Sequence, residues 1–467
     1  MIARKLPGST APRLSRATVA DQGAAPVRIV HLGLGNFFRA HQAWYTARAS
    51  DAKEWGIAAF TGRSASLADA LAPQDGLYTL VTRGSDGDQF EVIGSVSAVH
   101  PAGDHAAWLD YLRSTEISII TLTVTEAGYW RGPDGHLASD RPEVQQDVTA
   151  LVSDPTAPVM TAPGRLVAGF LARRAAGGGA LTVMSCDNLP GNGTMIAGVV
   201  GELAILVDPT LATWIADSVS WATSMVDRIT PRTVDADRGT VVAVTGLADA
   251  EPVVTEPFSE WVISGDFPGG RPAWESADAI FVDEVAPFEQ RKLWLLNGGH
   301  SLLAYGAGIR GHETVADAVA DPICRVWLEQ WWDEAGRHLT VSMDEVASYR
   351  VALLERFANP NIRHLLAQIA ADGSQKLPVR VVPALRAERA EGRVPQGATR
   401  ILAAWVCHLR GKGTPVKDPA QAQLAGFASE PLPVAIRDVL GFLDTELASD
   451  QPVLDAVLGH AEELLAA

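Results

Sequence analysis

Four polar residues that can act together on a hydroxyl or carbonyl group lie in the segment APFEQRKLWLLNGGHSLLAY: Glu289, Lys292, Asn297 and His300. On a helix with about 100° per residue, their side chains share an arc of about 140°. Oxidation of an alcohol needs a base for the hydroxyl proton and donors for the developing oxyanion. Because desolvation in a closed pocket lowers the pKa of a lysine, Lys292 is the candidate base and Asn297 the candidate donor. A solvated amphipathic face is the alternative interpretation.

Two glycines, Gly298 and Gly299, interrupt the same helical pattern. Inside a helix, each costs about 1 kcal/mol relative to alanine. Such a cost is expected where another group must approach the backbone closely.

A further candidate is Asn188 in the segment SCDNLPGNG, which follows the apolar run ALTVMS. If that run is a strand of a parallel sheet, Asn188 lies at the carboxyl edge, where ligands usually bind. The same residues are rich in turn formers, so an ordinary turn is the alternative.

Other kinds of catalytic site are not indicated. The three cysteines, Cys186, Cys324 and Cys407, are widely spaced, and no HExxH or CxxC ligand pattern occurs. There is no GxSxG nucleophile elbow and no Walker P-loop. The sequence therefore predicts a metal-independent protein of the reducing cytoplasm.

A glycine-containing turn, HLGLGNFFRAH, follows the apolar run VRIV and precedes a helical pattern. In a dinucleotide-binding turn the first glycine permits the tight bend, and the second lets the backbone approach a pyrophosphate. We expect Gly33, Gly35, Asn36 and Phe37 to contact a dinucleotide. Phe38 stands where a third glycine would complete the fingerprint, so an ordinary strand-to-helix turn is the alternative.

The choice between NAD and NADP depends on the end of the second expected strand, WGIAAFTGRS. An acidic residue there would bind the ribose hydroxyl, but none occurs before Asp69. Arg63 can instead accommodate a 2′-phosphate, or it is a surface charge beside the adenine. The cofactor is therefore predicted to be NAD or NADP.

Apolar runs that start at Val27, Trp55, Ile117 and Ala180 predict buried strands, and helical patterns separate them. After about residue 287, helix-period runs dominate, including NIRHLLAQIAADG. We expect an α/β chain with a loose N-terminal arm over residues 1–25, a Rossmann-type domain over 26–280 and a mainly helical domain over 281–467. The net charge of −17 argues against a nucleic acid partner, and no apolar run is long enough to span a membrane.

Taken together, several segments resemble the polyol-specific long-chain dehydrogenases, the family of mannitol 2-dehydrogenase and fructuronate reductase. The resemblance runs over residues 27–380 and rests on IVHLGLGNFFRAHQAWYT, LTVTEAGYW, TVMSCDNLPGNG, SMVDRITP, EPFSEWVI, PFEQRKLWLLNGGHS and DGSQKLP. It implies a Rossmann-type domain followed by a helical domain, with the active site between them. Many members of the family are monomers, which is our expectation here.

The resemblance also implies roles for individual residues. Lys292 matches the general base of a K-x4-N-x2-H pattern, and Asn188 and Asn297 match the two asparagines of an oxyanion hole. Glu289 matches a carboxylate that passes the proton toward solvent.

Substrate binding is implied for another group of residues. His300 and Asp227 match residues that bind and orient the substrate. The mannitol enzymes typically carry an arginine where this chain has Gln368, and the form QIA-x-DGSQKLP-x-R looks more like fructuronate reductase. Lys376 and Arg380 can then supply the cations that a uronate carboxylate needs, although Arg380 can also pair with a neighbouring acid.

The first hypothesis is therefore interconversion of D-fructuronate and D-mannonate by hydride transfer. The alternative is oxidation of D-mannitol to D-fructose or of a related polyol. A nucleotide-binding sensor without catalysis is a third hypothesis, against which the complete set of polar groups argues.

Overall fold

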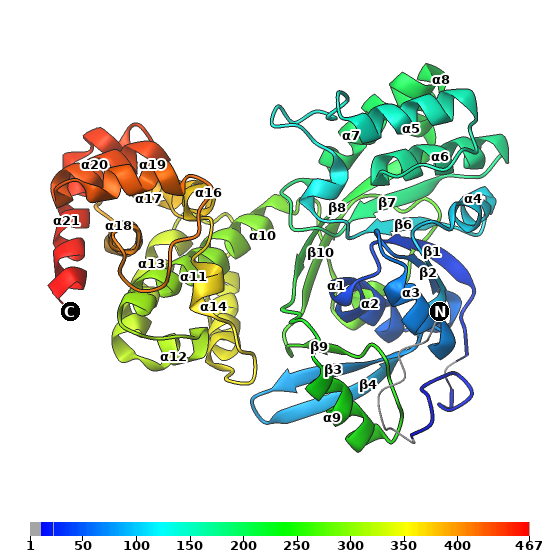
Figure 1. Cartoon of the computed structure of the whole chain (residues 1–467), viewed down its shortest axis with the longest axis horizontal. Coiled ribbons are helices and arrows are strands. Elements are labelled where there is room, and N and C mark those ends of the chain that lie inside the picture. The colour runs from blue at the N-terminus through cyan, green and yellow to red at the C-terminus, as the bar shows by residue number, and fades with distance from the viewer. Residues whose placement is uncertain (1–10, 22, 467) are drawn as a thin grey trace. The chain divides into compact units, whose positions relative to one another are not determined.

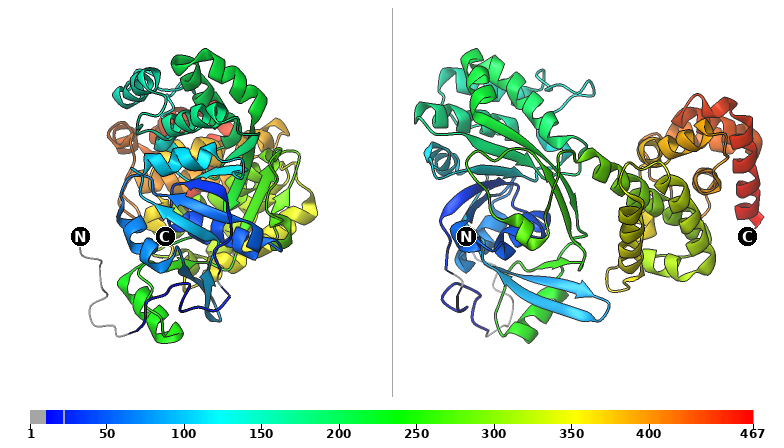
Figure 2. Two further views of the ribbon diagram at one scale, coloured as in Figure 1. Left: turned by 90° about the vertical axis from the view of Figure 1, so that its right-hand side faces the viewer. Right: turned by 180° about the vertical axis from the view of Figure 1, so that it is seen from behind.

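The computed structural model describes residues 11–21 and 23–466 (Figure 1, Figure 2). The chain divides into two compact units, Met1–Ala286 and Pro287–Ala467, which we call unit 1 and unit 2. Within the described residues, no helix combines the length and the hydrophobicity needed to cross a bilayer.

Unit 1 is built on an eight-stranded sheet. In spatial order its strands are β11 (Ile280–Phe281), β10 (Glu260–Ser264), β8 (Val219–Asp227), β7 (Leu181–Ser185), β6 (Ile119–Leu122), β1 (Val27–Leu32), β2 (Gly56–Phe60) and β5 (Val96–His100). The strands from β8 to β5 are parallel to one another, and only the β8–β10 pair is antiparallel. The strand order reverses at β1 and β6, as in a doubly wound dinucleotide-binding sheet. The predicted Rossmann-type fold is confirmed.

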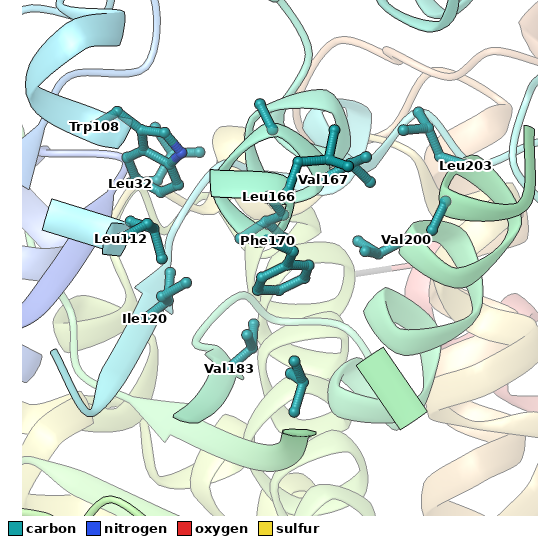
Figure 3. Packing of buried hydrophobic residues seen from close by; sticks show 14 of the residues in the cluster. Leu32, Trp108, Leu112, Ile120, Leu166, Val167, Phe170, Val183, Val200 and Leu203 are labelled. Carbon is teal, nitrogen blue, oxygen red and sulfur yellow. The ribbon is translucent and has the colours of Figure 1, made fainter. Parts of the chain in front are cut away.

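Helices cover both faces of this sheet (Figure 1). One face carries α4 (His105–Arg113), α5 (Pro142–Ser153), α6 (Ala162–Ala175), α7 (Asn192–Val207) and α8 (Pro209–Ser218). The other carries α1 (Asn36–Ala40) and α2 (Gln42–Arg48). Alternate residues of each strand point to opposite faces, so Val30 packs in the core under α4, α6 and α7, whereas Ile29 packs under α1 and α2. Figure 3 shows the first of these cores, with Trp108, Leu112 and Phe170 packed together.

The rest of unit 1 was not anticipated. A second sheet pairs β4 (Gly87–Ile93), β3 (Tyr78–Gly84) and β9 (Val253–Thr255). The remaining helices are α3 (Ser66–Leu71), α9 (Asp235–Thr245) and the 3₁₀ turns η1 (Ala52–Glu54), η2 (Ala72–Gln74), η3 (Glu126–Tyr129) and η4 (Trp274–Ala277).

Of the expected loose arm over residues 1–25, residues 1–10 and 22 lie outside the described structure. The described part, residues 11–21, is anchored at two points, although most of its residues are half-buried or exposed. Leu14 is 1% exposed, and the Arg16 guanidinium donates hydrogen bonds to two backbone carbonyls beside β5. A buried leucine and the Arg16 guanidinium therefore hold this segment against unit 1.

Unit 2 is mainly helical, as predicted. Its helices are α10 (Ala286–Arg291, which begins at the unit boundary), α11 (Gly299–Leu302), α12 (Val315–Ala320), α13 (Pro322–Gly336), α14 (Met343–Ala358), α15 (Leu366–Ile369), α16 (Gly373–Arg380), α17 (Val382–Ala390), α18 (Gln396–Leu409), α19 (Gln421–Ser429), α20 (Leu432–Leu443) and α21 (Gln451–Ala466), with the 3₁₀ turn η7 (Leu447–Ser449). Two π-helical segments, η5 (Lys292–Gly298) and η6 (Leu303–Ala307), adjoin α11.

The helix expected over NIRHLLAQIAADG is mostly absent. Within it, only Leu366–Ile369 and the last residue, Gly373, which begins α16, are helical, and Leu365 forms a β-bridge with Thr314. Because the backbone of this segment pairs with another strand-like residue, tertiary contacts override its helical pattern.

Candidate functional site

The glycine turn after β1 requires glycine at Gly33. Its φ is +116°, and an added Cβ would lie 2.1 Å from the Thr123 carbonyl oxygen. Gly35 differs, because an added Cβ would meet only the Gly33 carbonyl oxygen, at 3.5 Å. The protein thus crowds the first glycine and leaves the second open, which is the arrangement expected where a ligand approaches the second.

A buried histidine, His31, is connected to this turn by hydrogen bonds through Thr123. His31 Nδ1 lies 2.8 Å from Thr121 Oγ1, and His31 Nε2 lies 3.1 Å from Thr123 Oγ1. Thr123 Oγ1 in turn donates to the Gly33 carbonyl oxygen at 2.9 Å. Since the Thr123 hydroxyl has one proton, it must accept from His31 Nε2–H, which leaves His31 Nδ1 to accept from Thr121. Burial lowers the pKa of His31 to about 3, consistent with a neutral ring.

Asn36 and Phe37 lie in the first turn of α1, beside the glycines. The Asn36 amide donates to Thr233 Oγ1 at 3.3 Å and accepts from the buried Arg39 guanidinium at 2.7 Å. The Phe37 ring stacks on His41 with centroids 5.1 Å apart. The four residues predicted to contact a dinucleotide are therefore adjacent in space, and internal contacts orient two of them.

Arg63 is exposed in the loop after β2. Neither a hydrogen bond nor an ion pair joins it to any residue in the described ranges. Its guanidinium is thus available to a 2′-phosphate, but the same observation suits a plain surface charge.

Asn188 and Asp227 lie at the ends of two neighbouring parallel strands of unit 1, β7 and β8. Asn188 is exposed in the turn after β7, and Asp227 is the last residue of β8 and 5% exposed. Both lie at the carboxyl edge of the sheet, as does the glycine turn after β1. This is the edge at which the sequence placed Asn188; no position was predicted for Asp227.

Sequence reasoning missed a cavity beside the turn that carries Asn188. A cavity of about 380 Å³ opens at the same edge and is lined by Thr125, Glu126, Ala127, Tyr129, Arg131, Gly132, Leu189 and Met195. The motif LTVTEAGYW, which contributed to the sequence analysis only through the family resemblance, supplies four of the eight lining residues: Thr125, Glu126, Ala127 and Tyr129.

In unit 2, the segment with Lys292 begins a π-helix rather than continuing the α-helix. The projection at 100° per residue is wrong across η5, because a π-helix bonds residue i to i+5 and has more residues per turn. Lys292 and Asn297 are half-buried, and His300, in α11, is 7% exposed. Glu289 is half-buried in α10. This face is therefore not the freely solvated one of the alternative interpretation.

The close approach predicted from Gly298 and Gly299 comes from two buried tryptophans of α13. An added Cβ on Gly298 would lie 2.6 Å from the Trp331 ring, and one on Gly299 would lie 3.2 Å from Trp332 Nε1. The two indole N–H groups donate, each at 2.9 Å, to backbone carbonyls of η5. Because the two glycines have no side chains, the indole rings can come close enough to donate hydrogen bonds to backbone carbonyls of the π-helical segment.

His300 is held between two rings that sequence reasoning did not single out. It stacks on Phe357, with centroids 4.7 Å apart, and meets the edge of His364 at 4.9 Å. Burial lowers the pKa of His364. The neighbouring rings fix the plane of the imidazole that was predicted to bind substrate.

Arg380 and Lys376, both on α16, differ in what they contact. Arg380 Nη1 lies 3.5 Å from the Asn297 carbonyl oxygen and 3.4 Å from Ser301 Oγ. No ion pair joins Arg380 to a carboxylate among residues 11–21 and 23–466, so the predicted alternative of an acidic partner finds no support. Burial lowers the pKa of Arg380 to about 10.

Lys376 Nζ, by contrast, donates to the carbonyl oxygens of Ala371 at 2.5 Å and Ile369 at 3.3 Å. It thereby closes the turn between α15 and α16. Two of the three N–H donors of its ammonium group can therefore bond to backbone carbonyls of the protein itself.

One cluster of possible metal ligands occurs in the described part of the chain: His312, Asp321 and Cys324, with ligand atoms within 4.8 Å of one another. Arg310 Nε lies 2.8 Å from Asp321 Oδ2, which His312 Nε2 also contacts. The carboxylate also caps α13. The cluster is explained as a helix cap that binds two basic side chains, and the guanidinium charge opposes a metal ion there.

Comparison with known proteins gives concordant matches. Residues 27–276 match the mannitol dehydrogenase Rossmann domain, and residues 284–431 match the mannitol dehydrogenase C-terminal domain. D-mannonate oxidoreductase of Escherichia coli (strain K12) is 37% identical, over 84% of this chain and 82% of that protein. Mannitol 2-dehydrogenase of Cereibacter sphaeroides is also 37% identical, with the same coverage of both.

A solved structure, that of Pseudomonas fluorescens mannitol 2-dehydrogenase in ternary complex with NAD and D-mannitol, is similar to this chain with a TM-score of 0.77. The two sequences are 34% identical, and the match covers 98% of this chain and 94% of that chain.

Proposed function

Because the chain belongs to the mannitol dehydrogenase family of oxidoreductases, we propose that it interconverts D-fructuronate and D-mannonate with a nicotinamide dinucleotide. The observation that carries the choice of an acidic sugar is Arg380, a half-buried cation beside Asn297 without a carboxylate partner among the described residues.

The glycine turn of unit 1 fits a dinucleotide. Gly33 accepts a backbone conformation closed to other residues, and Gly35 presents a backbone that no Cβ shields. We assign the binding of the pyrophosphate to these glycines, with Asn36 and Phe37 beside them. The bound nicotinamide donates or accepts the hydride. Arg63, exposed after β2, makes NADP a cofactor to be compared with NAD.

In the direction of reduction, Lys292 protonates the carbonyl oxygen, and the amides of Asn188 and Asn297 stabilise its negative charge. These donors act on charge that grows in the transition state, which is where hydrogen bonds accelerate a reaction most. Glu289, three residues before the lysine, passes the proton between Lys292 and solvent.

His300 and Asp227 bind hydroxyl groups of the sugar. The ring of His300 keeps one orientation because Phe357 and His364 pack against it. Fixed orientation of the substrate lowers the entropic part of the barrier.

Arg380 binds the uronate carboxylate. A guanidinium makes charge-assisted hydrogen bonds that are about twice as strong as neutral ones. Lys376 adds positive charge nearby, but its ammonium group already donates to two backbone carbonyls.

Mannitol 2-dehydrogenase activity is the second candidate, because a relative with that name is as similar as the D-mannonate oxidoreductase. The two candidates are separated by kcat/KM for D-fructuronate and D-fructose with NADH and with NADPH. We expect fructuronate to be preferred, and a clear preference for fructose would defeat the first assignment.

The role of Arg380 is tested by Arg380→Met. A hydrogen bond to a charged group contributes about 1.5–3 kcal/mol, so Arg380→Met should lower kcat/KM for fructuronate by roughly 10- to 100-fold. The value for fructose should change much less. Equal losses for both sugars would show that Arg380 does not recognise the carboxylate.

The role of Lys292 is tested by Lys292→Ala. We expect turnover of every substrate to be lost while dinucleotide binding, followed by fluorescence titration, stays within about twofold of the wild type. Substantial turnover in this variant would rule out Lys292 as the acid–base group.

A further inference from the structure

We propose that Asp187 is a positioning residue that sets the oxyanion-binding amide of Asn188 by tying the turn after β7 to the loop after β6. This inference rests on the function proposed above, which gives Asn188 its role. Asp187 lies one residue before Asn188 and has no part in the acid–base chemistry.

The Asp187 carboxylate accepts three hydrogen bonds from the loop after β6. Oδ2 accepts from the Val124 backbone N–H at 2.9 Å and from the Tyr129 hydroxyl at 2.6 Å, while Oδ1 accepts from the Thr125 backbone N–H at 3.1 Å. Hydrogen bonds to a carboxylate are among the stronger ones in proteins. The side chain thereby joins two loops at the carboxyl edge of the sheet.

The loop that Asp187 holds has a strained backbone. Thr125 has φ of 67° and ψ of 163°, a conformation that a β-branched residue rarely adopts. Such strain persists only where the surroundings enforce it, and the hydrogen bond from Thr125 N–H to Asp187 is one such constraint. Strain at the edge where ligands bind indicates that the position of this loop matters.

The backbone of Asp187 is fixed from the opposite side. Its carbonyl oxygen accepts from Asn192 Nδ2 at 3.0 Å. The side chain of Asn192 is fully buried and also exchanges hydrogen bonds with the backbone of Ser224 in β8, at 2.7 and 3.0 Å. Asp187 is therefore held by the loop after β6 through its carboxylate and by β8 through its carbonyl. Because the backbone of Asp187 is fixed, the position of the next residue, Asn188, is restricted as well.

The loop and the turn also share a cavity of about 380 Å³. Thr125, Glu126 and Tyr129 line it from the loop, and Leu189 lines it from the turn. Release of the loop therefore changes the surroundings of Asn188 as well as its backbone.

The test compares Asp187→Asn with Asp208→Asn, an aspartate of the same unit that also accepts a backbone N–H, at the start of α8. The amide of Asp187→Asn cannot accept all three donors. A small displacement of a catalytic group can cost about 100-fold in rate, so we expect kcat to fall by about that factor. The KM for the dinucleotide should stay within about twofold. Asp208→Asn should leave both constants unchanged.

A double-mutant cycle distinguishes positioning of Asn188 from general support of the fold. If Asp187 acts through Asn188, Asp187→Asn should lower kcat about 100-fold in the wild type but less than about threefold in the Asn188→Ala background. Independent, multiplicative losses in an active enzyme would overturn the proposal.

Trypsin cleavage after the exposed Arg131 gives a readout of the loop that needs no activity. Asp187→Asn should be cut there at least several-fold faster than the wild type, and Asp208→Asn should not. An unchanged cleavage rate would also overturn the proposal. A wild-type enzyme that turns over neither uronates nor polyols would instead overturn the proposed function, whatever the cleavage rate.

Discussion

At the scale of single residues, the two glycines of the turn after β1 are required for different reasons. Gly33→Ala should destabilise unit 1 severely, because φ is +116° and the new Cβ would lie 2.1 Å from the Thr123 carbonyl oxygen. In Gly35→Ala, the added methyl group would make only an ordinary contact, 3.5 Å from the Gly33 carbonyl oxygen, and alanine accepts the extended backbone angles. The substitution should leave the unfolding free energy within about 0.5 kcal/mol but weaken dinucleotide binding by about tenfold or more. Thermal unfolding and fluorescence titration of both variants separate these effects, and equal dinucleotide affinity in Gly35→Ala would contradict the assigned contact.

His31 predicts a pH dependence of stability. Its pKa falls from 6.5 in the unfolded chain to about 3 in the folded one because the ring is buried. Between these values the unfolded chain binds a proton that the folded chain does not, so stability falls as the pH is lowered through this window, by up to about 1.4 kcal/mol per pH unit. His31→Gln can still bond to the threonines but cannot titrate.

The measurement is urea unfolding of wild type and His31→Gln at several pH values between about 7 and about 4. Other titrating groups are common to both proteins, so the difference between the two curves isolates His31. The unfolding free energy of the wild type should decline more steeply with acid. Parallel curves would show that the ring is not held neutral.

The sequence singles out residues whose side chains can do chemistry, and it does not single out residues whose proposed roles come from their contacts. Lys292 and Asn188 stand in dense, ordered motifs with distinctive neighbours. Asp187 and His364 have no such local signature, because their importance comes from what they touch: three donors from another loop in one case, and the ring of His300 in the other. Asp187 stands directly before Asn188 in the segment SCDN, but Asp-Asn followed by further turn-forming residues is also typical of an ordinary turn.

At the scale of elements, the π-helical segment is the main departure from expectation. The apolar spacing around Lys292 predicts a helix correctly, but hydrophobic period does not distinguish a regular α-helix from one with a π segment. The deciding contacts come from Trp331 and Trp332, whose indole N–H groups bond to carbonyls of η5. Two glycines in a row were the one local signal, and they indicated a close approach without identifying the partner.

Alanine substitutions at two glycines of the same helical stretch should have opposite effects on the free energy of unfolding. Gly298→Ala would bring a Cβ to 2.6 Å from the buried Trp331 ring and should lower the unfolding free energy by about 1–3 kcal/mol. Gly308→Ala is the control, because its Cβ would meet nothing nearer than 4.0 Å and its backbone is helical. It should be neutral or stabilising by up to about 1 kcal/mol. Chemical denaturation of both variants checks this, and equal effects would mean that the tryptophan contact does not set the requirement for glycine.

At the scale of the whole molecule, the sequence predicted the parallel sheet from its buried strands. β2, β6 and β7 are buried throughout and β1 over its last four residues, because helices cover both faces, and these strands are mainly apolar. Shorter or more polar strands were not predicted from the sequence: β8 reads VSWATSMVD, and β10 contains a glutamate and a serine. Polar residues interrupt both strands, so their apolar pattern is weaker. The helical character of unit 2 follows from its regular periodicity, whereas the anchored segment at residues 11–21 depends on contacts with distant residues.

The charge of the whole chain makes a last prediction about substrate choice. A net charge of −17 repels a uronate over long distances, while Arg380 attracts its carboxylate only at contact. The Debye length shrinks from about 30 Å at 0.01 M salt to about 8 Å at 0.15 M, so added salt screens the long-range repulsion far more than the half-buried contact. At saturating dinucleotide, kcat/KM for fructuronate should therefore rise a few-fold over this range, whereas that for neutral fructose should stay nearly constant. Arg380→Met should keep the rise but from a lower starting value. A fall with salt in the wild type would mean that local cations, rather than the net charge, govern the approach of the substrate.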